Sequence, residues 1–139
     1  MARSAPPTTD TRQWSAAEVE AHAHAALEAA MRHFRTPDTW DVSLYFSGAE
    51  VDSGAEISMD HVYLRAQITL NTEFLREHPG DIWRVIGHEV AHLTLAPFDL
   101  LWGKLGGKSR GEYVRAMENV VVHLERLWLR DNPDPKARP

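Results

Sequence analysis

The chain has 139 residues and a formal net charge of −5, with 43% hydrophobic and 25% charged residues. These values predict a single globular domain and argue against general disorder. The sequence has no cysteine, which excludes thiolate metal ligands and a cysteine nucleophile and fits a reducing compartment. The acidic balance, without a basic stripe, argues against nucleic-acid binding.

No stretch of the sequence suggests export or membrane insertion. The first dozen residues are polar and contain two prolines, so they do not resemble a signal peptide. No apolar run approaches the roughly 20 residues that span a bilayer. We therefore expect a cytoplasmic protein with no membrane partner.

The N-terminal part predicts a disordered arm followed by a helix. The arm covers residues 1–13, and the domain itself is expected over 14–130. Ser15 and Glu18 have the spacing of a capping box, in which each side chain satisfies a backbone donor of the first turn. The Ala-rich and Glu-rich segment behind them predicts a helix over 16–35.

A small sheet is expected in the middle of the chain. Apolar and polar residues alternate over 40–47 and over 62–70, which is typical of strands with one buried face. A shorter strand is expected around Ile57, and Asp60 with His61 suggests a turn.

The second half predicts mainly helix. The expected order is a helical turn, a helix opened by a Pro-Gly-Asp sequence, a glycine-containing loop, a final helix and a flexible tail. The helical turn is expected over 72–77 and the helix opened by Pro-Gly-Asp over 79–95. The loop is expected over 97–111, the final helix over 110–130 and the tail over 131–139. Strands grouped between helices predict an α+β domain with an antiparallel or mixed sheet packed on helices.

The segment His88-Glu89-Val90-Ala91-His92 carries the chemistry. Two histidines four residues apart lie on one face of a helix, so both imidazoles aim at one point. Zn²⁺ favours such nitrogen ligands, and Glu89 lies beside them as a general base for zinc-bound water. Apolar residues around the segment predict a mostly buried helix, in which these polar groups are costly without partners or metal.

The third ligand must come from elsewhere in the chain. A catalytic zinc site has three protein ligands and one open position. The final helix offers Glu112 at its start and Glu118 and Glu125 beside its apolar stripe. Helical geometry leaves the choice between Glu118 and Glu125 open.

Three segments between residues 60 and 130 match a known pattern: YLRAQITLN at 63–71, WRVIGHEVAHLTLAP at 83–97 and MENVVVHL at 117–124. Together they resemble the small gluzincin metallopeptidases of bacteria and phages, the minigluzincins. The resemblance implies a zincin-like fold and hydrolysis of peptide bonds in a peptide or protein substrate. It also implies that Glu118 is the third zinc ligand and that an edge strand over 62–70 pairs with extended substrate. The acidic residue usual four positions after that glutamate is Val122 here.

Other candidates have weaker support. Tyr63, Tyr113 and His123 are candidates for stabilising a developing oxyanion. His22 and His24 do not face each other on a helix and are expected at the surface. The alternative function is a zinc-stabilised binding or regulatory module that is inactive or autoinhibited, in which the metal contributes only folding energy.

Overall fold

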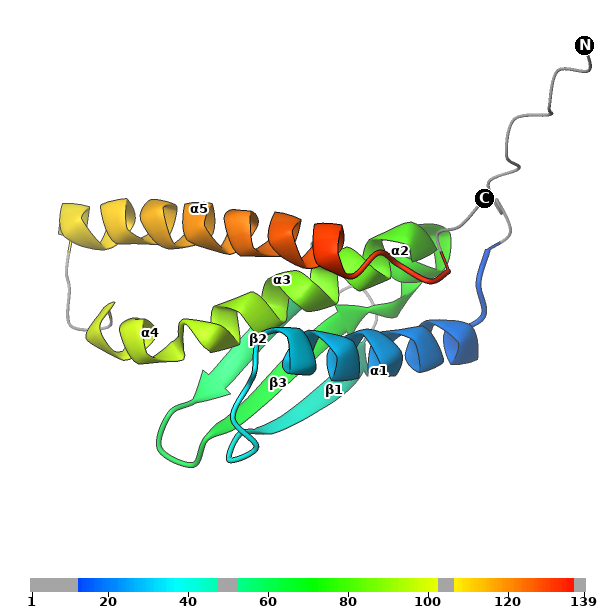
Figure 1. Ribbon diagram of the computed structural model, residues 1–139, viewed down its shortest axis with the longest axis horizontal. Coiled ribbons are helices and arrows are strands. Elements are labelled where there is room, and N and C mark those ends of the chain that lie inside the picture. The colour runs from blue at the N-terminus through cyan, green and yellow to red at the C-terminus, as the bar shows by residue number, and fades with distance from the viewer. Residues whose placement is uncertain (1–12, 48–52, 103–106, 137–139) are drawn as a thin grey trace, which may run out of the picture.

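The computed structural model describes residues 13–47, 53–102 and 107–136 of the 139-residue chain. Its elements form three layers, with a small sheet below, helices α1 and α3 on the sheet, and α5 on the outer side of α3 (Figure 1). The predicted α+β class is confirmed at this level. The predicted disordered arm lies, apart from residue 13, outside the described residues.

Helix α1 spans Ala16–His33 and begins as the sequence predicts. Ser15 is its N-cap, and the Ser15 hydroxyl oxygen accepts a hydrogen bond from the backbone N–H of Glu18 at 3.1 Å. The return contact from Ser15 Oγ to Glu18 Oε1 is 3.4 Å. The cap satisfies one of the orphan donors of the first turn and fixes where the helix starts.

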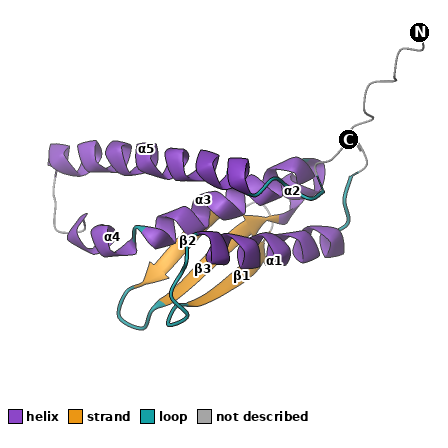
Figure 2. Ribbon diagram, in the orientation of Figure 1, coloured by secondary structure: helices purple, strands orange, loops and turns teal. Residues whose placement is uncertain are grey.

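The sheet has three strands in the order β1-β3-β2: β1 is Asp41–Ser47, β2 is Ala55–Asp60 and β3 is Arg65–Asn71 (Figure 2). Strands β1 and β3 are parallel, whereas β2 is antiparallel to β3, so the sheet is mixed. The side chains that β3 turns toward the helices are fully or almost fully buried: Ala66, Ile68 and Leu70. The core therefore lies between this face of the sheet and helices α1 and α3.

The predicted strand over 62–70 begins too early and has the wrong position in the sheet. The Asp60 carboxylate accepts the backbone N–H groups of Val62 and Tyr63, which makes a turn. Val62 is 82% exposed, and Leu64 has a positive φ of 54°, so pairing starts only at Arg65. Strand β3 is central, and the edge-strand prediction for this segment is therefore wrong. Alternating polarity is the same in central and edge strands, so the sequence could not separate them.

Helices α2, Thr72–Glu77, and α3, Ile82–Thr94, form as expected, with the short 3₁₀ helix η1, Pro79–Asp81, between them. Helix α3 is the central helix of the fold, because α1, α5 and β2 all pack against it. Its buried face includes Ile86 and Val90, both fully buried. This confirms that the segment with the two histidines belongs to a mostly buried helix.

The predicted loop over 97–111 is largely helical. Helix α4 spans Ala96–Trp102, and α5 already starts at Gly107 and runs to Asp131. Residues 103–106 are outside the description. The glycine content suggested a loop, but Gly107 alone among the described glycines has a positive φ, of 60°, and it stands at the helix start. None of the described helices is both long and apolar enough to cross a membrane.

The segment after α5 folds back against α1 and α3. The backbone carbonyl of Asn132 accepts a hydrogen bond from Trp83 Nε1 at 2.6 Å, and Asp134 Oδ1 lies 3.0 Å from His22 Nε2. His22 is only 4% exposed and lies between the rings of Trp14 and Trp83, so its predicted surface position is wrong. Helical spacing within α1 could not indicate this, since the covering residues come from distant segments. The flexibility of the tail over 131–139 stays a prediction.

Candidate metal centre

His88 and His92 lie one turn apart on α3, with ring centroids 5.1 Å apart. Each side chain is 20% exposed, so both rings reach the surface at the edge of a buried helix. The neighbouring positions Ile86 and Val90 hold the backbone of this turn in the core. The helix thus presents two imidazoles on one side while its other faces are packed.

Glu118 of α5 lies opposite the two rings. Its Oε1 is 3.0 Å from His92 Nε2, and its Oε2 is 3.6 Å from His88 Nε2. One ligand atom from each of the three residues lies within 4.8 Å of the others. The structure therefore brings together the three residues that the sequence analysis named as zinc ligands.

Close packing of α5 on α3 brings Glu118 near the two histidines. Gly87, just before His88, lies directly beneath the indole of Trp128, which is fully buried. Trp128 Nε1 donates a hydrogen bond to the backbone carbonyl of Trp83 at 3.1 Å, which fixes the ring on α3. The missing side chain at residue 87 allows the helices to approach, so a carboxylate of α5 reaches the histidines.

The separation of each histidine nitrogen from one oxygen of Glu118 is of the size that two ligands of one metal ion, such as zinc, require. Two ligands at 2.0–2.1 Å from zinc with a tetrahedral angle between them are about 3.4 Å apart. The nitrogen-to-oxygen distances of 3.0 and 3.6 Å bracket this value. Two imidazoles and one carboxylate leave a fourth position for water or substrate, as catalytic zinc sites require.

The electrostatics of His92 favour a neutral imidazole. Burial lowers its pKa, Glu118 acts in the opposite direction, and His88 lowers it further. A neutral ring is the form that binds a metal through a nitrogen lone pair.

Glu89 is a buried carboxylate on the same helix as the two histidines, with 8% exposure. Its pKa is raised from 4.5 to about 8, mainly by burial and then by the charges of Glu118 and Glu56. A hydrogen bond from the backbone of Ile57 in β2 opposes this shift. The side chain of Glu89 therefore points from α3 toward strand β2. It lies next to the ligand group but is not part of it.

Glu125 is held in a different way from Glu118. Its Oε1 lies 3.3 Å from Nδ1 of His88 and 3.3 Å from a terminal nitrogen of Arg84. It is 9% exposed and contacts the side of the imidazole remote from Nε2. Sequence reasoning considered Glu125 only as a ligand, although the seven-residue spacing from Glu118 already placed both on one helix face.

Strand β2 was missed as part of the site. In the order β1-β3-β2 it is an edge strand, and it packs against α3. The backbone of Ile57 makes a hydrogen bond to the Glu89 carboxylate, so the backbone groups of Ile57 face the free edge of β2. Because backbone groups point alternately to the two sides of a strand, those of Ala55 and Met59 face the same edge. A short strand was expected around Ile57, but nothing in the local sequence placed it at the edge of the sheet beside Glu89.

The remaining candidates are not members of the ligand group formed by His88, His92 and Glu118. Glu112 and His123 are exposed on α5, and Tyr63 is 71% exposed in the turn before β3. Tyr113 is half-buried, and its pKa is raised by loss of solvation and by the charge of Asp99. Asp99 of α4 in turn lies 3.2 Å from His61 Nε2.

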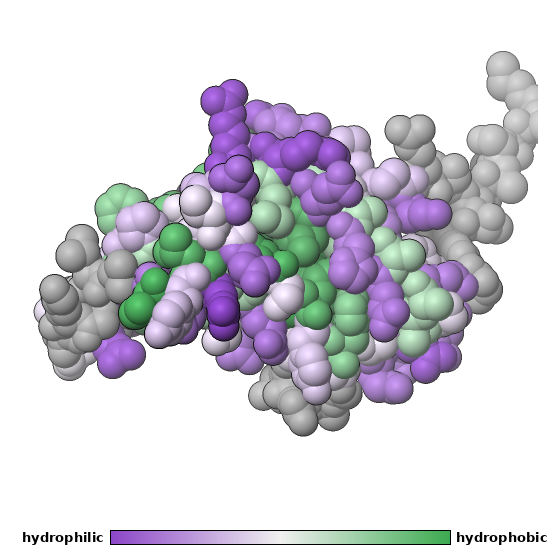
Figure 3. All heavy atoms as spheres, turned by 90° about the horizontal axis from the view of Figure 1, so that it is seen from below, coloured by the Kyte–Doolittle hydropathy of each residue, from purple (hydrophilic) through white to green (hydrophobic). Residues whose placement is uncertain are grey.

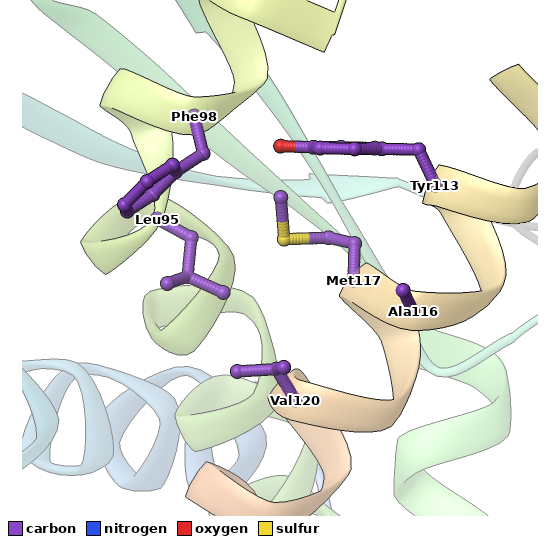
Figure 4. A pocket seen from close by; sticks show the side chains of 6 residues that line it. All are labelled: Leu95, Phe98, Tyr113, Ala116, Met117 and Val120. Carbon is purple, nitrogen blue, oxygen red and sulfur yellow. The ribbon is translucent and has the colours of Figure 1, made fainter. Parts of the chain in front are cut away.

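An apolar hollow of about 300 Å³ lies between α4 and the first half of α5. Figure 4 shows Leu95 and Phe98 on one side and the α5 residues on the other, with the Tyr113 hydroxyl directed across the space. The lining residues are Leu95, Phe98, Tyr113, Ala116, Met117 and Val120. Apolar side chains also reach the surface at this end of the molecule in the space-filling view (Figure 3), and Phe98 is 56% exposed.

Comparisons of the chain with protein-family models, curated proteins and solved structures give no match. Its function must therefore be argued from the site itself.

Proposed function

We propose that the chain is a zinc-dependent peptidase of the zincin type, similar to the minigluzincins, with His88, His92 and Glu118 as zinc ligands and Glu89 as general base. The observation that carries the proposal is the convergence of one ligand atom from each of the three residues within 4.8 Å beside a buried glutamate. Zinc bound there supplies a Lewis acid that polarises a carbonyl group and acidifies a water molecule.

Glu89 performs the proton transfers. Its carboxylate accepts a proton from the water that attacks the peptide carbonyl and returns it to the departing amine. The pKa of about 8 belongs to the metal-free chain. A cation held by the ligand group would lower it and so favour the carboxylate form that acts as base. The Ile57 backbone hydrogen bond holds the carboxylate in place for both steps.

The free edge of β2 provides the means to bind a peptide. Backbone groups at Ala55 and Met59 face the same edge as Ile57, which itself contacts Glu89. An extended peptide that adds to this edge as a further strand runs past the general base. We therefore expect cleavage within extended or unfolded segments of a peptide or protein.

A peptide-cleavage assay with matched metal analysis tests this function. Zinc-loaded wild-type protein is expected to cleave a mixed library of unstructured peptides, and Glu89→Gln is expected to bind zinc equally well without cleavage. Equal cleavage by Glu89→Gln would refute its role as base. Zinc binding that raises the melting temperature without cleavage of any peptide would support the alternative, a zinc-stabilised module without turnover.

A further inference from the structure

Glu125 is a buried carboxylate that belongs to none of the roles assigned so far. It is 9% exposed, yet it is not part of the ligand group formed by His88, His92 and Glu118. A carboxylate at such a position is costly unless its oxygens have partners. Its partners therefore indicate what it does.

The partners of Glu125 are two nitrogens that share one oxygen. His88 Nδ1 and a terminal nitrogen of Arg84 each lie 3.3 Å from Glu125 Oε1. A guanidinium group only donates hydrogen bonds, and a carboxylate paired with it accepts them. His88 must therefore carry its proton on Nδ1 to bond the same oxygen.

This proton position decides which nitrogen of His88 is available to a metal. In a neutral imidazole with Nδ1 protonated, the lone pair is on Nε2. Nε2 is the nitrogen that lies 3.6 Å from Glu118 Oε2, on the side where the ligand atoms converge. The opposite tautomer would place a hydrogen there.

Arg84 fixes Glu125 in turn. Arg84 lies one helical turn before His88, and its Nε is also 3.7 Å from Asp81 Oδ1 at the start of α3. The side chain is therefore held between two carboxylates, and it compensates the charge of Glu125 along the seam between α3 and α5.

We propose that Glu125 is a positioning residue that fixes the tautomer and orientation of His88 through its Nδ1–H, with Arg84 holding the Glu125 carboxylate in place. The inference rests on the proposed zinc site, because it assigns Nε2 as the metal-binding nitrogen of His88. It adds a residue that touches neither metal nor substrate but sets the affinity of the centre.

Two variants and one control test the proposal. Glu125→Leu removes the acceptor, Glu125→Gln keeps an acceptor oxygen, and Glu112→Leu makes the same change at an exposed position of the same helix. Zinc affinity is measured by competition with a chromophoric chelator. We expect a loss of about 10–100-fold for Glu125→Leu, a smaller loss for Glu125→Gln and no loss for Glu112→Leu.

The tautomer of His88 gives a second measurement that a merely structural role would not move. Imidazole ¹⁵N spectra of the metal-free protein are recorded at pH 9, above the ordinary imidazole pKa of about 6.5. We expect Nδ1–H in the wild type and in Glu125→Gln, and a shift toward Nε2–H in Glu125→Leu. Wild-type protein with His88 in the Nε2–H form would overturn the proposal, even if Glu125→Leu fails to fold.

The outcomes separate this inference from the proposed function. If the wild type binds no zinc, the proposed function fails, but the tautomer spectra still decide the role of Glu125. If His88→Ala abolishes zinc binding while Glu125→Leu keeps both wild-type affinity and the Nδ1–H form, only the positioning role is overturned.

Discussion

Replacement of Gly87 by alanine tests the close approach of α3 and α5. An added Cβ at residue 87 would overlap Cδ1 and Nε1 of Trp128 and lie 2.8 Å from its Cγ. The indole cannot move aside easily, because it is fully buried and hydrogen-bonded to the Trp83 carbonyl. Overpacking typically costs 1–3 kcal/mol and occasionally more, so with a rigid partner we expect a net cost of about 2–4 kcal/mol. For a chain of this length the melting temperature should fall by roughly 6–15 °C.

The assay is thermal and urea unfolding of the metal-free protein, followed by circular dichroism. Gly111→Ala is the matched control, because it also adds a methyl group to a helical glycine but meets no atom within 4 Å. There the change should stabilise the fold by up to about 1 kcal/mol, since alanine favours helix over glycine.

A double variant isolates the contact. Gly87→Ala should cost much less in a Trp128→Leu background than in the wild type, because the atoms that it meets are gone. A Gly87→Ala protein as stable as Gly111→Ala would refute the helix packing described for α3 and α5. The same packing brings Glu118 to the histidines, so Gly87→Ala should also weaken zinc binding.

Two further predictions concern stability. The pKa of Glu89 is raised from 4.5 to about 8 on folding, so between these pH values the folded metal-free chain holds a proton that the unfolded chain has lost. Its free energy of unfolding should therefore fall by roughly 3–5 kcal/mol as pH rises from 4.5 to 8. In urea titrations, Glu89→Gln should remove most of this fall in the free energy of unfolding. If the free energy of unfolding of Glu89→Gln depended on pH as strongly as that of the wild type, the raised pKa of Glu89 would be contradicted. Ser15→Ala removes the N-cap of α1 and should lower stability by about 1 kcal/mol, whereas an unchanged unfolding midpoint would argue against the cap.

Much of the local structure could be predicted from the sequence, because local rules determine it. The capping box at Ser15, the helix that carries His88 and the alternation along β3 all depend on residues within one or two turns or a single strand. The two histidines belong to this class, since their spacing on a helix alone makes their rings converge.

The features that the sequence did not predict depend on contacts between distant segments. Strand order makes β2, rather than β3, the edge beside Glu89, and no local pattern encodes that order. The partners of Glu125 and His22 come from other elements, and so does the burial that raises the pKa of Glu89. In the sequence, Gly87 is an ordinary helical glycine, because no local pattern indicates that the ring of Trp128 packs directly on it.

Zinc stoichiometry measures the central claim most directly. Purified wild-type protein, Glu118→Ala and Glu112→Ala are equilibrated with Zn²⁺, dialysed and analysed for metal per chain. We expect one tightly held zinc in the wild type and in Glu112→Ala, and a strong loss in Glu118→Ala. Wild-type protein without bound zinc, or Glu118→Ala with undiminished zinc, would contradict a centre formed by two helices around one metal ion.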